Sequence, residues 1–339
     1  MLGGFRAILA AVVVAFHLGV HPFGVWMGVS AVTMFYLISG YAMTGLLESR
    51  FPSPRYALRF YAERFVRLAP QYYLWMALLA VAQFAFVPTK LDMSNWMPYG
   101  MVAYLTVLPM GLQAYLGTVK TWLNPNVTTL GIECCLYVFS PWVLRSYALS
   151  IVAAVAGFGI FVAAEAGAFD FNTYTYYTFP GPLIFYMLGS FAYRKRWIAF
   201  GVFAIALVVL LLRRWQSHFN QEYLVVMLLG LPVFLMLVRL PANKIDSALG
   251  DASYGCYLGH EMVIGLWKGL FDTPTSGLAI AATTVFSLAY GYLTFWLVER
   301  PTIPFRRRIR GRASAASTAT DLGARAMPST VVVSATVQG

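Results

Sequence analysis

The chain has 339 residues, of which 60% are hydrophobic and only 11% are charged, and its mean hydropathy is +0.68. A soluble domain carries about 25% charged residues, so this composition excludes an ordinary water-soluble globular protein. The formal net charge of +11 would suggest nucleic acid as a partner of a soluble protein. In a membrane protein it is explained by basic cytoplasmic loops, so we expect no nucleic acid partner.

Long apolar segments follow one another along almost the whole chain, and a segment of roughly 20 apolar residues is long enough to span a bilayer as a helix. We therefore predict an all-α, polytopic membrane helix bundle with about ten transmembrane helices. The segment 97–117 is rich in Pro and Gly, which favours a re-entrant or interfacial path over a full crossing. The candidate segments are 5–21, 24–47, 70–88, 97–117, 127–144, 147–165, 178–193, 197–212, 222–239, 252–271 and 277–299.

The distribution of basic residues predicts the orientation. With a cytoplasmic N-terminus and no crossing at 97–117, 19 of the 24 Lys and Arg residues lie on the cytoplasmic side, against 10 if that segment crosses. Because cytoplasmic loops are enriched in Lys and Arg, we predict the first arrangement, with both termini cytoplasmic. Residues 1–310 then form the transmembrane domain. Residues 311–339, rich in Ala, Ser and Thr, are expected to form a disordered cytoplasmic tail.

Two ionisable residues share a face of the first predicted span. Arg6 and His17 are eleven residues apart, and at about 100° per residue they return to within roughly 20° of one another, some 16 Å apart along the axis. Ionisable groups in hydrocarbon are costly, so both residues are functional candidates. The alternative left open is that Arg6 is a topology signal and His17 a packing residue.

A carboxylate is predicted at the depth of this imidazole. In the predicted topology the segment 127–144 runs from outside to inside, which places Glu133 about as deep as His17. A carboxylate beside an imidazole can fix its tautomer and raise its basicity, as a general base requires. We predict that Glu133 and His17 form such a pair, and a purely structural ion pair is the alternative.

Further polar residues are candidates for binding or support. Arg64 and Arg67 precede the third predicted span, and a spacing of three places them on one helix face. Arginine pairs suit bidentate phosphate binding, although anionic lipid headgroups or topology would need the same residues. His260, near the middle of a late span, could line the same cavity or hydrogen-bond a neighbouring helix. The histidines are scattered and the three cysteines fit no metal motif, so no metal site is predicted.

Six short motifs occur in one order along residues 5–301. They are Arg6 with His17, Gly28-Val29 with Ser39-Gly40, Arg64 with Arg67, Glu133 with Tyr137, Tyr257 with His260, and Glu299-Arg300-Pro301. Together they resemble the acyltransferase 3 family of bacterial membrane acyltransferases. The chain departs from the family pattern at Ser30 and Ala31, where an acidic residue is often found, and around Thr128.

This resemblance implies transfer of an acyl group, usually acetyl, from cytoplasmic acyl-CoA to a hydroxyl of a cell-surface carbohydrate or lipid-linked glycan. It implies a multi-pass protein of the bacterial inner membrane, surrounded by membrane lipids, with acyl-CoA as a co-substrate and no permanently bound cofactor. His17 and Glu133 would be catalytic, with His17 as the general base. Arg6, Arg64 and Arg67 would bind the CoA phosphates, and Ser39, Tyr137 and His260 would support the site.

Two alternatives stay open at this stage. A proton-coupled transporter or flippase would use the same intramembrane charges, and it predicts an internal repeat with matching broken helices, of which we find no convincing example. Within the acyltransferase hypothesis, the sequence does not separate direct transfer from a covalent acyl-histidine intermediate.

Overall fold

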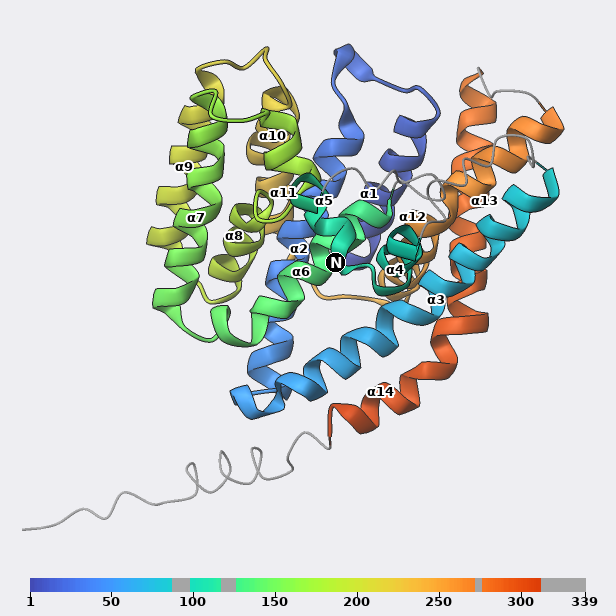
Figure 1. The fold of residues 1–339 in the computed structure, drawn as a ribbon, viewed down its shortest axis with the longest axis horizontal. Helices are drawn as coiled ribbons and strands as arrows, with labels where there is room; N and C mark the ends of the chain where they lie inside the picture. Colours follow the sequence, from blue (N-terminus) through green and yellow to red (C-terminus); the bar gives the residue numbers. More distant parts are fainter. Residues whose placement is uncertain (87–97, 117–125, 272–275, 312–339) are drawn as a thin grey trace, which may run out of the picture.

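The computed structural model describes residues 1–86, 98–116, 126–271 and 276–311. These residues form helices and no strand, which confirms the all-α prediction (Figure 1). The predicted tail lies outside the described residues from 312 onwards, as do Lys90 and Lys120 of the predicted outer loops.

The helices differ in whether they are long and apolar enough to span a membrane. Within the described ranges, four such helices occur: α2, α7, the run 220–237 and the run 277–309. Shorter apolar helices are α1, α6, α8 and α9, and the predicted count of about ten spans stays a prediction. The main helices are α1 (Leu2–His17), α2 (Met27–Arg50), α3 (Ala57–Phe86), α6 (Val127–Val143), α7 (Tyr147–Glu165), α8 (Leu183–Tyr193), α9 (Trp197–Leu212), α10 (Asn220–Val225), α11 (Leu231–Leu237), α12 (Lys244–Phe271), α13 (Gly277–Thr294) and α14 (Ile303–Ile309).

The Pro- and Gly-rich segment 97–117 is not one helix. It consists of α4 (Pro98–Thr106), a 3₁₀ turn (Leu108–Leu112) and α5 (Gln113–Leu116). The chain turns at Val107, whose φ is 64°, and Pro109 follows in the next turn, where its fixed φ suits the start of a new helical element. The break agrees with the expected absence of a continuous spanning helix here.

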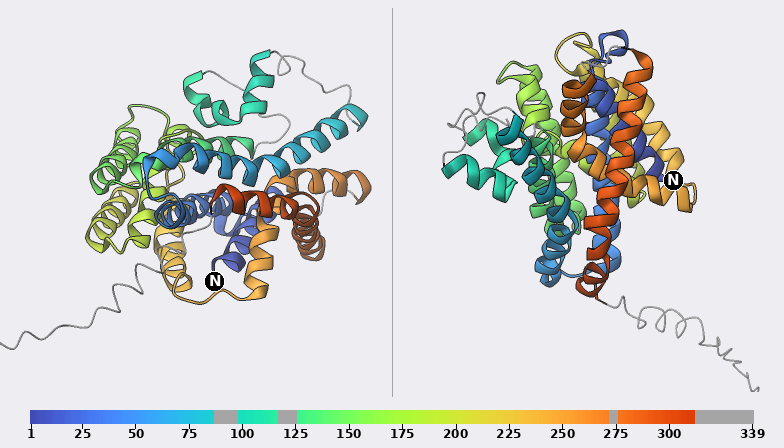
Figure 2. Two further views of the ribbon diagram at one scale, coloured as in Figure 1. Left: turned by 90° about the horizontal axis from the view of Figure 1, so that it is seen from below. Right: turned by 90° about the vertical axis from the view of Figure 1, so that its right-hand side faces the viewer.

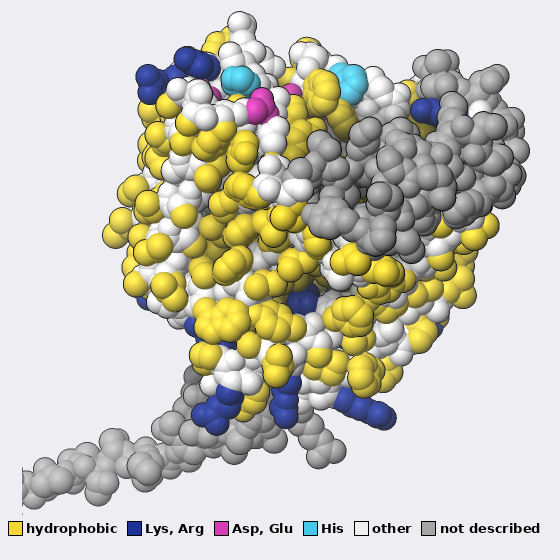
Figure 3. Space-filling model, in the orientation of Figure 1, with side chains coloured by type: hydrophobic (Ala, Val, Ile, Leu, Met, Phe, Trp, Pro, Cys, Tyr) yellow, Lys and Arg dark blue, Asp and Glu magenta, His cyan; other side chains and the backbone are white. Residues whose placement is uncertain are grey.

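The bundle has two groups of helices with α1, α2 and α6 between them. Helices α7 to α11 lie on one side, and α3, α12 and α13 on the other (Figures 1 and 2). On the face shown in Figure 3 an apolar band lies between Lys and Arg side chains at the lower end and a mixture of basic, His and acidic side chains at the upper end. An apolar band between two polar ends is the surface expected of a membrane protein.

Helix α2 contacts α8 through their backbones. A Cβ atom built on Gly189 would lie 2.0 Å from the carbonyl oxygen of Leu37, and one built on Gly40 would lie 1.9 Å from that of Tyr186. Only glycine permits this approach, and small residues at helix contacts are the usual means of close packing between membrane helices. The contact fixes α2 within the bundle, and α2 carries Ser39 into its centre.

A buried carboxylate attaches the C-terminal helix α14 to α3. Glu63 is 0% exposed and accepts hydrogen bonds from Arg64 (2.6 Å) and Arg306 (3.1 Å). Arg310 donates to the same carboxylate at 2.6 Å. Arg306 also lies 3.3 Å from Glu299. A buried charge without partners would be strongly unfavourable, so this network holds the basic end of the bundle together.

We expect Gly189→Val to weaken the fold, because its side chain would meet the backbone of α2. Overpacking of this kind costs roughly 1–3 kcal/mol or more. The measurement is the thermal unfolding midpoint and the monodispersity of the detergent-purified protein. Gly201→Val on α9 is the control, since nothing lies within 4 Å of a Cβ atom built there. Equal midpoints for the two variants would contradict the proposed contact.

Glu63 should make stability depend on pH. Burial alone raises its pKa, but Arg64, Arg310 and Arg306 outweigh this effect and hold the pKa below its ordinary value of 4.5. A carboxylate whose pKa is lowered by folding stabilises the native state above its unfolded-state pKa, and this stabilisation disappears as the pH falls through the folded-state pKa. We therefore expect the unfolding midpoint of the wild type to drop below about pH 4.5.

Glu63→Gln should be less stable than the wild type at neutral pH and should lose less on acidification. The matched control is Glu48→Gln, because Glu48 is exposed and pairs with Arg194 at the surface, where an ion pair contributes about 0–1 kcal/mol. Parallel midpoint-against-pH curves for wild type and Glu63→Gln would show that Glu63 is not responsible.

Candidate functional site

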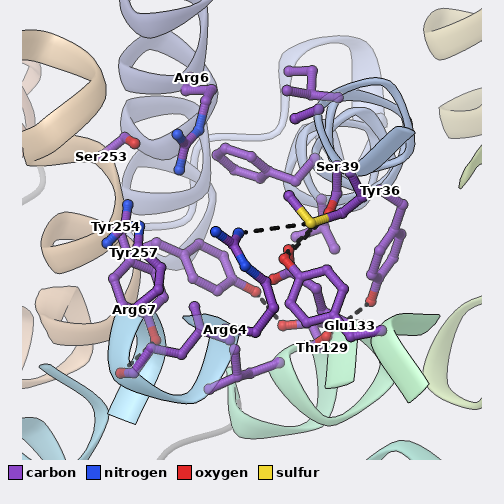
Figure 4. A pocket seen from close by; sticks show the side chains of 18 residues that line it. Arg6, Tyr36, Ser39, Arg64, Arg67, Thr129, Glu133, Ser253, Tyr254 and Tyr257 are labelled. Atoms are coloured by element: carbon purple, nitrogen blue, oxygen red, sulfur yellow. Dashed lines mark hydrogen bonds between the residues drawn. The ribbon is translucent and has the colours of Figure 1, made fainter. Parts of the chain in front are cut away.

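A polar cavity of about 140 Å³ lies inside the bundle, and we call it the arginine cavity (Figure 4). Side chains from α1, α2, α3, α6 and α12 line it. The polar and aromatic residues among them are Arg6, Phe35, Tyr36, Ser39, Arg64, Arg67, Thr129, Glu133, Tyr137, Ser253, Tyr254 and Tyr257. The fold therefore brings together six of the residues predicted from sequence: the three arginines, Ser39, Glu133 and Tyr137.

Helical periodicity explains how single helices supply several of these side chains. Thr129, Glu133 and Tyr137 are four residues apart on α6 and therefore share one face. Arg64 and Arg67 are three apart on α3, as the sequence predicts. Each helix thus presents a polar stripe to the cavity.

The three arginines of the cavity differ in their partners. Arg64 is paired with Glu63, and Arg67 is paired with Glu299. Arg6, which is half-buried, has no carboxylate partner among the residues that the structure describes. Because a guanidinium in an apolar bundle requires an anionic or hydrogen-bonding partner, Arg6 is the member of the trio most available to an anionic ligand.

Glu133 is held by two hydroxyl groups of the cavity. Ser39 Oγ donates a hydrogen bond to Glu133 Oε1 at 2.9 Å, and the Tyr137 hydroxyl donates to the same oxygen. The two hydroxyl oxygens lie 3.4 Å apart. The predicted supporting residues Ser39 and Tyr137 therefore contact Glu133.

His17 lines a second cavity of about 200 Å³, which we call the histidine cavity. Its other polar and aromatic lining residues are Phe16, Trp26, Gln113, Asn126, Thr128, Thr129, Tyr176, Tyr177 and Tyr257. Arg6 and His17 both face the interior from α1, as their spacing predicts. They line different cavities, however, because the separation along the helix axis is large.

The predicted pairing of His17 with Glu133 is wrong in this structure. His17 Nδ1 lies 2.7 Å from Oε1 of Glu261, a residue of α12. His260 lies beside the pair, with its ring centroid 4.9 Å from that of His17. Equal depth in the membrane was the basis of the Glu133 prediction, and depth carries no information on which helix is the lateral neighbour.

Helix α12 is a lateral neighbour of α1, and the two helices run in the same direction. Near the start of both helices a Cβ atom on Gly3 would lie 1.8 Å from the carbonyl oxygen of Asp246. The Gly4 amide also donates to Asp246 Oδ1 at 2.8 Å. Further along both helices, His17 meets Glu261. The sequence signal for Glu261 was its ionisable side chain within a predicted span, directly after His260.

The two cavities share a wall. Val32, Thr129 and Tyr257 line both of them. The hydroxyl groups of Thr129 and Tyr257 are hydrogen-bonded to each other. The Tyr36 hydroxyl donates to the Thr129 carbonyl oxygen at 3.4 Å, a long bond. The arginines lie on one side of this wall and His17 lies on the other. The side chains of Thr129 and Tyr257, which stand between them, can change rotamer.

Three side chains next to the histidine cavity could hold a metal ion. Ligand atoms of His17, His260 and Glu261 all lie within 4.8 Å of one another. The prediction of no metal site rested on the scatter of the histidines along the chain. That ground fails, because the fold brings His17 and His260 together.

Comparison with known protein families identifies the family of the chain. A family model described as an acyltransferase domain, Acyl_transf_3, matches residues 2–297, a range that contains every residue predicted for the site. No curated protein and no solved structure gives a match. The match covers most of the chain, and it includes both cavities and the helices that build them. The chain therefore belongs to the acyltransferase 3 family and is a membrane acyltransferase.

Proposed function

We propose that this acyltransferase moves an acyl group, with acetyl as the default, from acyl-CoA to a hydroxyl of a cell-surface carbohydrate or lipid-linked glycan. One observation carries the proposal: a cavity lined by three arginines shares a wall with a cavity that contains His17. Acyl-CoA brings phosphates for the arginines and a thioester on a thin arm, so a single donor suits both features.

Arg6 is the principal donor-binding residue in this proposal. Its guanidinium faces the arginine cavity without a carboxylate partner in the described ranges of the chain. Arg64 and Arg67 are already paired with Glu63 and Glu299. Their contribution to anion binding is therefore smaller, because an anionic ligand must compete with these carboxylates.

His17 performs the proton transfer. The hydroxyl of the acceptor gives its proton to the imidazole, and the hydroxyl oxygen forms a bond to the thioester carbonyl carbon. The carbon–sulfur bond breaks, and the CoA thiolate takes the proton back from the imidazolium. This direct transfer leaves the histidine neutral at the end of each cycle.

The lining of the histidine cavity suits a carbohydrate acceptor. Trp26, Tyr176 and Tyr177 offer aromatic faces for the C–H surface of a sugar ring. Gln113 and Asn126 provide amide donors and acceptors for hydroxyl groups. A mainly apolar pocket with a few polar groups is the usual design of a specific small-molecule site.

The proposed location is the bacterial inner membrane, with about ten spans and both termini in the cytoplasm. Most basic residues then lie in the cytoplasm, where acyl-CoA is found. In this topology His17, at the end of α1, lies nearer the opposite side, where a surface glycan or its lipid-linked precursor would bind. The thioester passes the Thr129–Tyr257 contact to reach His17.

Release of free CoA thiol from acetyl-CoA by the purified protein tests the function. We expect turnover that depends on extracted surface glycan, and a fall of about 10²–10⁴-fold in kcat for His17→Ala, since a general base contributes that much. Arg59→Ala is the control, because Arg59 is exposed and lies over the ring of Tyr56, away from both cavities.

Two other results would change the proposed function or the proposed mechanism. If the wild type neither binds nor turns over acyl-CoA with any glycan, the donor assignment is wrong and flux assays for a transporter should follow. If labelled acetyl stays on the protein when acceptor is omitted, and is lost in His17→Ala, the reaction proceeds through a covalent acyl-histidine and not by direct transfer.

Arg6→Ala should raise the KM for acetyl-CoA by about 10–100-fold, the loss of one charge-assisted hydrogen bond or more. Arg64→Ala should raise it less, because Arg64 is already paired with Glu63. Donor affinity measured by calorimetry and initial rates at varied acetyl-CoA separate binding from chemistry. An equal effect of the two substitutions would show that the paired arginine binds the donor as strongly as Arg6.

A further inference from the structure

The contact between His17 and Glu261 determines which nitrogen of His17 carries hydrogen. Nδ1 of His17 lies 2.7 Å from Glu261 Oε1, a normal hydrogen-bond distance. An ionised carboxylate can only accept hydrogen bonds, so Nδ1 must be the donor. In a neutral imidazole the other nitrogen, Nε2, then has the lone pair.

Nε2, the nitrogen that is not bonded to Glu261, belongs to His17, and His17 lines the histidine cavity. His17 and Glu261 keep side-chain exposures of 27% and 25%, whereas His260 is fully buried at 0%. A substrate hydroxyl in the cavity can therefore approach His17, but His260 is shielded from it. Of the two imidazoles in this cluster, that of His17 is therefore the one a substrate can reach.

His260 does not compete for the carboxylate. Its Nδ1 lies 2.9 Å from the carbonyl oxygen of Tyr257, which can only accept, so this nitrogen is protonated. Its Nε2 lies 3.8 Å from Glu261 Oε1, too far for a hydrogen bond, and has no partner in the described structure. The ring instead packs beside His17, with 4.9 Å between centroids, and restricts the orientation of that imidazole.

We infer that Glu261 is the positioning residue of the acyl transfer. It holds His17 in the Nδ1–H tautomer and thereby makes Nε2 the atom that takes the proton from the acceptor hydroxyl. The inference rests on the proposed function for its catalytic part, whereas the tautomer itself is a property of the resting protein. Glu133, held by Ser39 and Tyr137 in the arginine cavity, has no part in this step.

The side chains of His17, His260 and Glu261 could instead bind a metal ion together. The experiment must distinguish a bound metal from the hydrogen-bonded pair of His17 and Glu261. Two imidazoles and a carboxylate suit a divalent metal such as Zn²⁺, and a ring N–H donated to a backbone carbonyl is common for a metal-binding histidine. A direct 2.7 Å hydrogen bond between His17 and Glu261 leaves no room for an ion between these two atoms, and it favours the paired state.

The test combines spectroscopy with kinetics. The chain has four histidines, so ¹⁵N-histidine NMR of the protein in nanodiscs gives few signals, and His17→Ala identifies those of His17. We expect a protonated Nδ1 and an unprotonated Nε2 in the wild type. Glu261→Leu should give a mixture of tautomers and a kcat reduced by about 100-fold or more, with the acceptor KM little changed.

Glu261→Gln gives a second variant should Glu261→Leu fail to fold. Its amide oxygen still accepts the hydrogen bond but lacks the charge, so we expect the tautomer to be kept and kcat to fall by about 10-fold. Glu48→Gln, which removes an exposed carboxylate paired with Arg194, is the matched control and should behave like the wild type.

Unchanged tautomer and kcat in Glu261→Leu would overturn the inference. So would activity that a chelator removes and Co²⁺ restores, with a visible Co²⁺ absorption that requires both His17 and His260, since that result would identify a metal site. If the tautomer depends on Glu261 but no variant or wild type transfers acyl groups, the proposed function fails while the pairing stands.

Discussion

The bundle depends on the rule that a charge removed from water must have a partner. Glu63 satisfies it through three arginines, and Glu299 satisfies it through Arg67 and Arg306. These pairs attach α14 to α3 and close the basic end. Arg6 is the exception in the arginine cavity, because no described carboxylate pairs with it. The same rule that explains the network thus marks Arg6 as the position where the proposed donor would supply negative charge.

Close backbone contacts decide which polar groups meet. Gly3 lets α1 approach α12 at Asp246, and the two helices then continue in the same direction. Since the side chains of adjacent parallel helices pair at similar heights, this contact at the start of α1 brings His17 to Glu261 at its end. A substitution at Gly3, far from the chemistry, would therefore shift the imidazole relative to its carboxylate.

Reasoning from the sequence correctly predicted features that depend on the periodicity of a single helix. It did not predict contacts that depend on how two helices pack together. The all-α class, the Arg64–Arg67 face and the common orientation of Arg6 and His17 follow from apolar length and periodicity alone. The partner of His17 does not follow from these patterns. A position along the chain gives the depth of a residue in the membrane, but it does not give which helices are neighbours. Glu133 was expected at the depth of His17 and Glu261 nearer the middle of its span, and only the packing of α1 on α12 shows that Glu261 is the neighbour.

Helix α12 carries one residue of the wall between the cavities and the carboxylate that contacts His17, the proposed general base. Tyr257, which closes the wall with Thr129, and Glu261, which holds His17, are four residues apart and share one face of this helix. Rotation of the whole helix would open the wall and withdraw the carboxylate together, which would disable the base as the thioester arrived. Rotation of the Tyr257 side chain alone opens the wall and leaves Glu261 in place. Under the proposed mechanism His17 needs Glu261 in place during proton transfer, so a local change at Tyr257 fits the proposal and rotation of the whole helix does not.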